Sequence, residues 1–490
     1  MTDTSDETLS LALPWRMALA VLAGLLLAAG YALHPLWWAP WLAAPALIVA
    51  AGGGRGHAWL IGATAGAVSV TSVLGYYLGQ SGLWLGTLII VALRILSWGG
   101  AARFAVLAGR RLPAVWAMFV LPVFMAAIET LTLMVSIHGA AGSLAYSQMD
   151  VPAVIQVAAI GGVSLIVFII LLPGSFLGVW LVRRRAPLEI TLAAGVLGAV
   201  AVAVGLYANE RLAAPQGPAK VHATLIATDR FDIIATDWPE VWRIYAPQVA
   251  ASARPGGVVV LPEKIALLDT VHVAVAVADL STAARQTRAT VVAGLEVHDG
   301  AVYHNRALIV GPDGRVAWYT KQRLVPGWED RDVPGHAPLL IKVAGVPLGV
   351  AICKDMHIPS IGREYAGATG VMIVPAWDFG QDGWMGARMT ALRGVEGGYA
   401  VARSVRNGLV GAYDNTGRII AEAPSGPGMT VVEADVPTQI RPTFYARLGN
   451  VFGLACIAAL VILICALVRR RAQANVATRG GIVPVHASKD

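Results

Sequence analysis

One cysteine, Cys353, is the residue of this chain best suited to nucleophilic chemistry. It ends an apolar run, residues 345–353, whereas the other two of the three cysteines, Cys456 and Cys465, lie in a C-terminal stretch apolar enough for a bilayer. Cys353 therefore has no obvious disulfide partner. Because a thiol is mostly protonated at neutral pH, it attacks a carbonyl carbon only after a base or a nearby cation has activated it.

Glu263 and Lys321 have the side chains that such activation needs. Each of them, like Cys353, follows a short apolar run of strand length, and strand ends are where α/β folds assemble their sites. Glu263 can accept the thiol proton, and Lys321 can stabilise the oxyanion that forms when the thiolate attacks. The structural alternative stays open for each residue taken alone, since a buried cysteine is usually a small core residue and a Glu or Lys after a strand is usually solvated.

These three residues fall within residues 209–446, a segment in which apolar runs alternate with turn signals and amphipathic stretches. The alternation predicts a single α/β domain with a first helix at residues 238–253 and a hairpin turn at residues 311–314. We expect strands at residues 221–227, 258–261, 290–296, 303–310 and 315–320, at the runs that end at Cys353 and Pro375, and within residues 399–433.

Most of the remaining chain is apolar enough for a membrane. Hydrophobic residues make up 56% of the chain and charged residues only 14%, which is typical of an integral membrane protein. Since a spanning helix needs about 20 mostly apolar residues, we expect spans near residues 15–33, 37–52, 58–77, 82–102, 113–134, 154–182, 187–208 and 447–468. This predicts a seven-helix membrane domain over residues 1–208, an eighth helix after the α/β domain, and a cytoplasmic tail over residues 469–490.

Arginines mark one side of these spans. On alternate turns the chain carries Arg55, then Arg103, Arg110 and Arg111, then the run 183–185, and finally the run 469–471. Because short cytoplasmic loops concentrate Lys and Arg, we expect these turns in the cytoplasm and residues 209–446 on the opposite side. The same loops account for much of the net charge of +7, so nucleic-acid binding is not expected.

Three stretches around the candidate residues resemble the nitrilase superfamily, also called carbon-nitrogen hydrolases, whose members use a Glu-Lys-Cys triad in this chain order. They are residues 261–264, 319–326 and 351–355. One branch of the superfamily, the apolipoprotein N-acyltransferases, carries a multi-span membrane domain before the catalytic domain and one helix after it, and the resemblance to this branch covers nearly the whole chain. The resemblance implies an α-β-β-α sandwich with Glu263, Lys321 and Cys353 as its triad.

Two further residues resemble positions of this family. Glu329 ends a segment similar to the family motif Lys-x-x-Leu-Val-Pro-x-x-Glu, which implies that its carboxylate orients Lys321 or Glu263. Trp238 is similar to a tryptophan that the family places near its active site. Both residues are therefore expected to support the reaction or to bind substrate.

The two residues after Cys353 depart from the family pattern. Lys354 and Asp355 stand where this branch usually has Tyr and Glu. We expect Lys354 to lower the thiol pKa or to pair with a carboxylate such as Asp355 or Glu329, and its backbone N–H to be a second oxyanion donor. Asp355 and His357 alone are no metal-ligand set, so neither a metal nor a cofactor is expected.

The resemblance also implies a reaction. The enzyme would be an acyltransferase that moves an acyl chain from a phospholipid donor to the N-terminal amine of a diacylglyceryl-cysteine lipoprotein, with a thioester on Cys353 between two half-reactions. It would be a multi-pass monomer in the inner membrane of a bacterial cell, with its catalytic domain on the periplasmic side. Two alternatives stay open: a membrane-anchored nitrilase-like amidase or acyltransferase with a different acceptor, and a catalytically inactive, lipid-binding relative.

Overall fold

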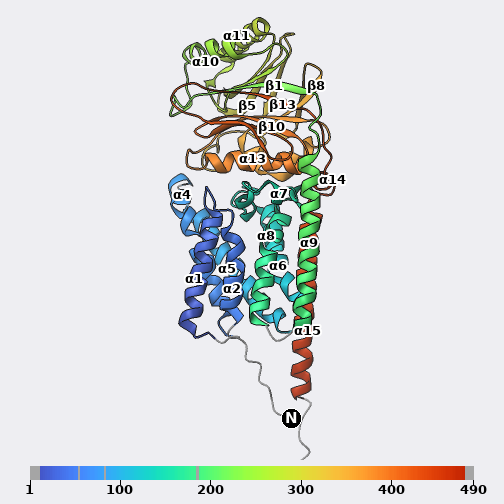
Figure 1. Ribbon diagram of the computed structural model, residues 1–490. Coiled ribbons are helices and arrows are strands. Elements are labelled where there is room, and N and C mark those ends of the chain that lie inside the picture. Colours follow the sequence, from blue (N-terminus) through green and yellow to red (C-terminus); the bar gives the residue numbers. More distant parts are fainter. Residues whose placement is uncertain (1–10, 53–55, 82–83, 184–186, 480–490) are drawn as a thin grey trace, which may run out of the picture.

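The computed structural model describes residues 11–52, 56–81, 84–183 and 187–479. The chain forms an elongated molecule, with a bundle of apolar helices at one end and an α/β sandwich at the other (Figure 1). Arg55, Arg184 and Arg185, on which part of the predicted orientation depends, lie outside the described residues, as does the predicted tail from residue 480 onward.

The bundle packs its helices closely through small residues. Its helices are α1 (Leu13–Tyr31), α2 (Ala39–Gly52), α3 (Ala58–Val68), α4 (Thr71–Ser81), α5 (Trp84–Gly109), α6 (Ala114–Val135), η1 (Leu144–Gln148), α7 (Pro152–Ile155), α8 (Ala158–Val182) and α9 (Pro187–Ala213). A Cβ at Gly62 or Gly66 of α3 would collide with the backbone carbonyl of Trp98 or Arg94 of α5. Glycine is therefore what allows these two helices to touch.

Five helices in the described ranges are long and apolar enough to cross a membrane, namely α1, α5, α6, α8 and α9. α3 and α4 meet at a bend of 51° and form a sixth candidate if they are counted together. α2 and Val451–Ala466, the apolar part of α15 (Val451–Arg479), are shorter helices. The predicted total of eight spans therefore stays a prediction.

The segment predicted as one span at residues 154–182 is interrupted. α7 ends at Ile155, and α8 is broken at Gly161 and Gly162, where Gly162 has a φ of +63°. The ring of Tyr445 packs where a Cβ on Gly162 would lie. The break thus has a cause in tertiary packing, and the candidate span in this segment is the kinked helix Ala158–Val182.

The other end of the molecule is a sandwich of two β-sheets. Its strands are β1 (Lys220–Ala227), β2 (Val258–Val260), β3 (Leu267–Leu268), β4 (Thr290–Asp299), β5 (Val302–Val310), β6 (Val316–Thr320), β7 (Leu339–Val343), β8 (Val346–Val350), β9 (Val371–Trp377), β10 (Ala400–Arg406), β11 (Leu409–Tyr413), β12 (Ile419–Pro424) and β13 (Thr430–Pro437). The first sheet has the order β13-β1-β2-β4-β5-β6, with β3 beside β4, and the second has the order β12-β11-β10-β9-β8-β7.

Helices cover both outer faces of this sandwich (Figure 1). α10 (Trp238–Ser252) and α11 (Thr270–Thr287) pack on the first sheet, at the end of the molecule farthest from the bundle. α13 (Gly383–Gly397) lies between the second sheet and the bundle, beside the short α12 (Pro359–Tyr365). The expected α-β-β-α sandwich is confirmed, and so is the hairpin turn, in which the Gly311 N–H donates to the carbonyl of Arg315 at 2.9 Å.

The bundle and the sandwich share one hydrophobic core. A single cluster of buried side chains extends from the bundle through Ala351 and Met356 to Leu392 and Val395 of α13. α13 is buried along nearly its whole length because it has apolar neighbours on both sides. The turn that follows β8 is therefore held at the side of the sandwich that faces the bundle. After the last strand, α14 (Phe444–Leu448) leads the chain back into α15.

Candidate active site

Cys353 lies in a strained turn after β8, the strand next to the edge strand β7 of the second sheet. β8 ends at Val350, and Cys353 begins η2 (Cys353–His357) with a φ of +42°. A non-glycine residue rarely adopts this left-handed conformation, and such residues gather at functional sites. The residue is 7% exposed, and Sγ lies 3.6 Å from the carbonyl oxygen of Trp377, the last residue of β9.

Glu263 is held at the same end of β9. Its backbone N–H donates to the carbonyl of Ala376 at 3.3 Å, one residue before the carbonyl that accepts from Cys353. The Glu263 side chain is 4% exposed. The ends of β2 and β8, one from each sheet, thus bring the acid and the thiol to one place, as the strand-end rule predicts.

Lys321 lies between two carboxylates. It follows β6, and its Nζ lies 2.7 Å from Oε1 of Glu263 and 2.9 Å from Oε2 of Glu329. Nδ2 of Asn305 on β5 donates to both carboxylates, at 2.6 Å each. All of these side chains are buried. Glu329 thus contacts Lys321, one of the two residues that we expected it to orient, and Asn305 adds a link between the two carboxylates that was not predicted.

The opposite charges of Lys321 and Glu329 shift each other's pKa values, so that both groups stay ionised. Burial lowers the pKa of Lys321, but the carboxylates of Glu263 and Glu329 outweigh burial and raise that pKa well above its usual range. Burial raises the pKa of Glu329, but the ammonium groups of Lys321 and Lys264 lower it to about 2. Lys321 is therefore an ammonium ion and Glu329 a carboxylate at any pH near neutrality.

The thiol of Cys353 is protonated in this resting arrangement. Burial raises its pKa well above the usual range, the carboxylate of Glu263 raises it further, and the ammonium of Lys321 opposes both. A thiolate therefore forms only as the proton leaves for a base.

Asp355 anchors the turn that carries Cys353. Its carboxylate accepts hydrogen bonds from the Tyr319 hydroxyl at 2.8 Å and from the backbone N–H groups of Gln322, Arg323 and Ile352 at 3.0, 2.8 and 3.1 Å. These bonds join the turn at Cys353 to the segment that follows Lys321. Burial raises the pKa of Asp355 to about 6.

Lys354 does not form the ion pair that we expected with Asp355 or Glu329. Its Nζ donates instead to the carbonyl oxygen of Leu324 at 2.7 Å. Asp355 already accepts four hydrogen bonds, and Glu329 already binds two ammonium groups, those of Lys321 and Lys264. Burial, with the like charge of Lys321, lowers the pKa of Lys354 to about 8. The pKa of Cys353 is raised overall, by burial first and then by the carboxylate of Glu263, so a lowering by Lys354 is outweighed and its effect on the thiol stays a prediction.

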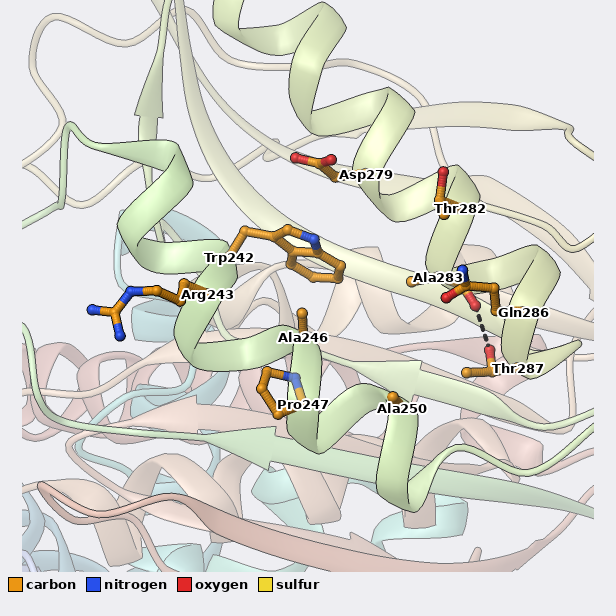
Figure 2. Close-up of a pocket in the computed structure, with 10 residues that line it drawn as sticks. All are labelled: Trp242, Arg243, Ala246, Pro247, Ala250, Asp279, Thr282, Ala283, Gln286 and Thr287. Atoms are coloured by element: carbon orange, nitrogen blue, oxygen red, sulfur yellow. Dashed lines mark hydrogen bonds between the residues drawn. The ribbon is translucent and has the colours of Figure 1, made fainter.

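Trp238 lies in the outer layer of the sandwich. It is fully buried at the start of α10, its Nε1 donates to Oδ2 of Asp279 on α11 at 2.8 Å, and its ring stacks on Trp242. A cavity of about 450 Å³, lined by Trp242 and Asp279 among other residues, lies between α10 and α11 (Figure 2). The structure thus brings the other six predicted residues together and leaves Trp238 outside that group.

A second ion pair adjoins the thiol and was not predicted. Asp378 directly follows Trp377, and its carboxylate binds the guanidinium of Arg403 on β10. Burial raises the pKa of Asp378 to about 7. The rule that found Glu263 also applies to Asp378, a polar residue directly after an apolar strand. Within the described ranges, no group of three or more His, Cys, Asp or Glu side chains could hold a metal ion.

Segments of the bundle contact this site directly. The N–H of Ala140, in the loop after α6, donates to the carbonyl of His357 in η2 at 3.0 Å. The hydroxyl of Tyr76 on α4 donates to Oδ2 of Asp382 at 2.7 Å, four residues after Asp378. The candidate site therefore lies where the sandwich meets the helices.

Comparisons with known proteins agree with both parts of the chain. Residues 23–176 match the family described as apolipoprotein N-acyltransferase N-terminal domain, and residues 207–443 match the family described as carbon-nitrogen hydrolase. An apolipoprotein N-acyltransferase of Geobacter metallireducens is 26% identical over 372 residues, which is 67% of this chain and 70% of that protein.

Other similarities cover less of the chain. An apolipoprotein N-acyltransferase of Bradyrhizobium diazoefficiens is 28% identical over 201 residues, or 34% of this chain and 35% of that protein. A crystal structure of an amidase from Nesterenkonia sp. is similar over 46% of this chain and 91% of the amidase, with 19% identity and a TM-score of 0.39.

Proposed function

Because the chain belongs to the apolipoprotein N-acyltransferase family and is therefore an N-acyltransferase, we propose that Cys353, Glu263 and Lys321 carry out its reaction through a thioester. The acyl chain passes from a phospholipid to Cys353, and then to the N-terminal amine of a diacylglyceryl-cysteine lipoprotein. The observation that carries this proposal is the buried contact of Lys321 with both Glu263 and Glu329, beside a strained cysteine.

The first half-reaction acylates the cysteine. Glu263 takes the thiol proton, and the sulfur of Cys353 attacks the ester carbonyl carbon of the phospholipid. The ammonium of Lys321 and the backbone N–H of Lys354 stabilise the oxyanion. The ester C–O bond then breaks, and Glu263 returns the proton to the alkoxide of the departing lysophospholipid. Asn305 and Lys321 both donate to Oε1 of Glu263, so we assign the proton transfer to Oε2.

The second half-reaction transfers the acyl chain to nitrogen. The acceptor amine attacks the thioester carbon, Glu263 removes a proton from the nitrogen, and the same two donors hold the oxyanion. The C–S bond breaks, and Glu263 gives the proton that it took from the nitrogen to the sulfur of Cys353. The free thiol is restored, which gives ping-pong kinetics.

The contacts with the bundle support a lipid donor. Exposing an acyl chain to water costs roughly 0.8 kcal/mol per methylene group, so a site beside the bilayer avoids most of that cost. The turn at Cys353 lies close to the bundle because His357 accepts a hydrogen bond from Ala140. An ester at the membrane surface can thus approach the thiol while its chains stay in hydrocarbon.

We further propose that the sandwich lies on the periplasmic side of a bacterial inner membrane. Arg110 and Arg183, at the far ends of α5 and α8, donate to the carbonyls of Gly52 and Leu112 at 3.4 and 2.8 Å. These arginines thus mark the end of the bundle away from the sandwich (Figure 1). The positive-inside rule assigns that end to the cytoplasm.

The second candidate is an acyltransferase with a different acceptor. It is favoured by Lys354, a buried cation beside the thiol at a position where a protonated amine would be repelled. Acceptor competition decides between the two. We expect the acylated full-length protein in vesicles to lose its acyl chain to a diacylglyceryl lipopeptide much faster than to water or to a simple amine. Equal rates would favour the second candidate, and no transfer to any of the three would overturn both.

A further inference from the structure

A second buried lysine, Lys264, lies behind the triad. Its Nζ is 2.9 Å from Oδ2 of Asp332, 3.2 Å from Oε1 of Glu329 and 3.6 Å from Oε2 of Glu296. Its side chain is 7% exposed, and it directly follows Glu263 with a left-handed φ of +50°. The carboxylate of Glu329 is therefore shared between two ammonium groups, one from Lys264 and one from Lys321.

The position of Lys264 is stabilised from several sides. Its carbonyl oxygen accepts a hydrogen bond from Nη1 of the buried Arg406 at 3.1 Å. Burial lowers the pKa of its ammonium, but Glu329, Glu296 and Asp332 outweigh burial and raise that pKa. Lys264 thus stays charged in a buried location, a costly arrangement that needs the surrounding carboxylates.

Lys264 also balances the charge of the whole cluster. Four buried carboxylates, those of Glu263, Glu329, Glu296 and Asp332, surround Lys321 and Lys264, while Arg331 reaches Glu296 from the rim at 3.0 Å. Among the described residues, Oε2 of Glu296 and Oδ1 of Asp332 are buried without a hydrogen-bond partner. Without Lys264, Lys321 would be the one buried ammonium group of the described ranges left to form ion pairs with these four carboxylates.

We propose that Lys264 is a positioning residue for acyl transfer, because it shares the Glu329 carboxylate with Lys321 and so fixes the ammonium that faces the oxyanion. This inference rests on the proposed function, and it assigns Lys264 no contact with substrate. Since Glu329 also binds Lys321, any loss of its charge or position moves the group that stabilises the oxyanion.

The electrostatics of Glu329 support this role. The charged groups around its carboxylate are Lys321 after β6, Lys264 after β2, and Lys354 in η2, and its polar partners are Asn305 on β5 and the backbone N–H of Val325. The two closest cations outweigh burial and keep its pKa at about 2. Removing the charge of Lys264 raises this pKa, so Glu329 becomes protonated at a higher pH and releases Lys321 there.

The test compares the rate at which an acyl adduct forms on Cys353 in the full-length protein in phospholipid vesicles, followed by intact mass over the pH range in which the protein stays folded. We expect Lys264→Met to slow acylation about ten- to hundred-fold, as loss of a hydrogen bond to a charged group does, and to move the acid limb of the rate profile to higher pH. Lys264→Arg, which keeps the charge, should recover most of the rate.

A double variant separates positioning from mere charge neutralisation. Lys264→Met with Asp332→Asn removes one positive and one negative charge in nearly unchanged shapes. Positioning predicts that acylation stays slow and that the acid limb stays shifted, whereas a purely structural role predicts recovery of the wild-type rate, which would overturn the inference. A wild-type rate and profile in Lys264→Met alone would also overturn it. Failure of the proposed function is distinguishable, because the wild-type protein would then form no adduct.

Discussion

Lys321 and Glu263 form a buried ion pair, with 2.7 Å between Nζ and Oε1. The proposed base, Glu263, and the proposed oxyanion donor, Lys321, thus neutralise each other in the resting site. Removing one partner of a buried pair leaves an uncompensated charge and costs about 3–5 kcal/mol. Substitutions of either residue therefore affect folding together with chemistry, and the neighbours of the pair test the mechanism more cleanly.

Asn305 is such a neighbour. Asn305→Leu keeps the side-chain size but removes the two bonds that Nδ2 donates to Glu263 and Glu329. We expect the rate of acyl-adduct formation to fall roughly ten- to hundred-fold, because hydrogen bonds to charged groups contribute about 1.5–3 kcal/mol each. Single-turnover intact-mass measurements give the rate. His304→Ala, a change at the more exposed residue next to it in β5, should leave the rate near wild type, and equal effects of the two substitutions would count against a role of Asn305 in the site.

The titration of Lys354 predicts how the acylation rate changes at alkaline pH. Its pKa is lowered to about 8 by burial and by the like charge of Lys321, so its ammonium loses a proton as the pH rises through about 8. Because this cation lies next to the thiol in the chain, we expect acylation to slow over that range. In Lys354→Arg the side chain stays charged, and the alkaline limb should move to higher pH in rate profiles of the two proteins. An unchanged limb in Lys354→Arg would show that another group titrates.

Tyr76 tests the connection between the bundle and the site. Tyr76→Phe removes the hydroxyl that donates to Asp382 at 2.7 Å. We expect adduct formation from a long-chain phospholipid to slow several-fold, because this bond joins α4 to the segment after β9 near the thiol. Adduct formation from a short, water-soluble acyl ester should not change, since that donor needs no contact with the bundle. Equal slowing with both donors would contradict a role in lipid delivery.

Most of the candidate site could be predicted from the sequence because its residues directly follow strands. The residues directly after apolar runs, Glu263, Lys321 and Cys353, lie together because parallel and antiparallel strands of two packed sheets end at one edge. The same rule would have found Asp378. Asn305 and Lys264 left no such signal, because a polar residue inside or just past a strand is as common on a solvated face as in a buried network.

Tertiary packing explains the remaining differences. The break of α8 at Gly162 depends on Tyr445, which lies far along the chain. Lys354 pairs with a backbone carbonyl because four other donors already bind Asp355. The ring of Trp238 stacks on Trp242 and binds Asp279 of α11, and a local motif does not reveal this placement. Each of these outcomes depends on residues that no spacing rule connects.

The acyl adduct on Cys353 is the most direct test of the central claim. The full-length protein is incubated with phospholipid vesicles, and its intact mass is measured before and after treatment with hydroxylamine, beside Cys353→Ala as the control. We predict a mass increase of one acyl chain that maps to Cys353, that hydroxylamine removes, and that Cys353→Ala lacks. An unmodified wild-type protein that still transfers acyl chains to a lipopeptide, or an adduct that persists in Cys353→Ala, would contradict the thioester mechanism.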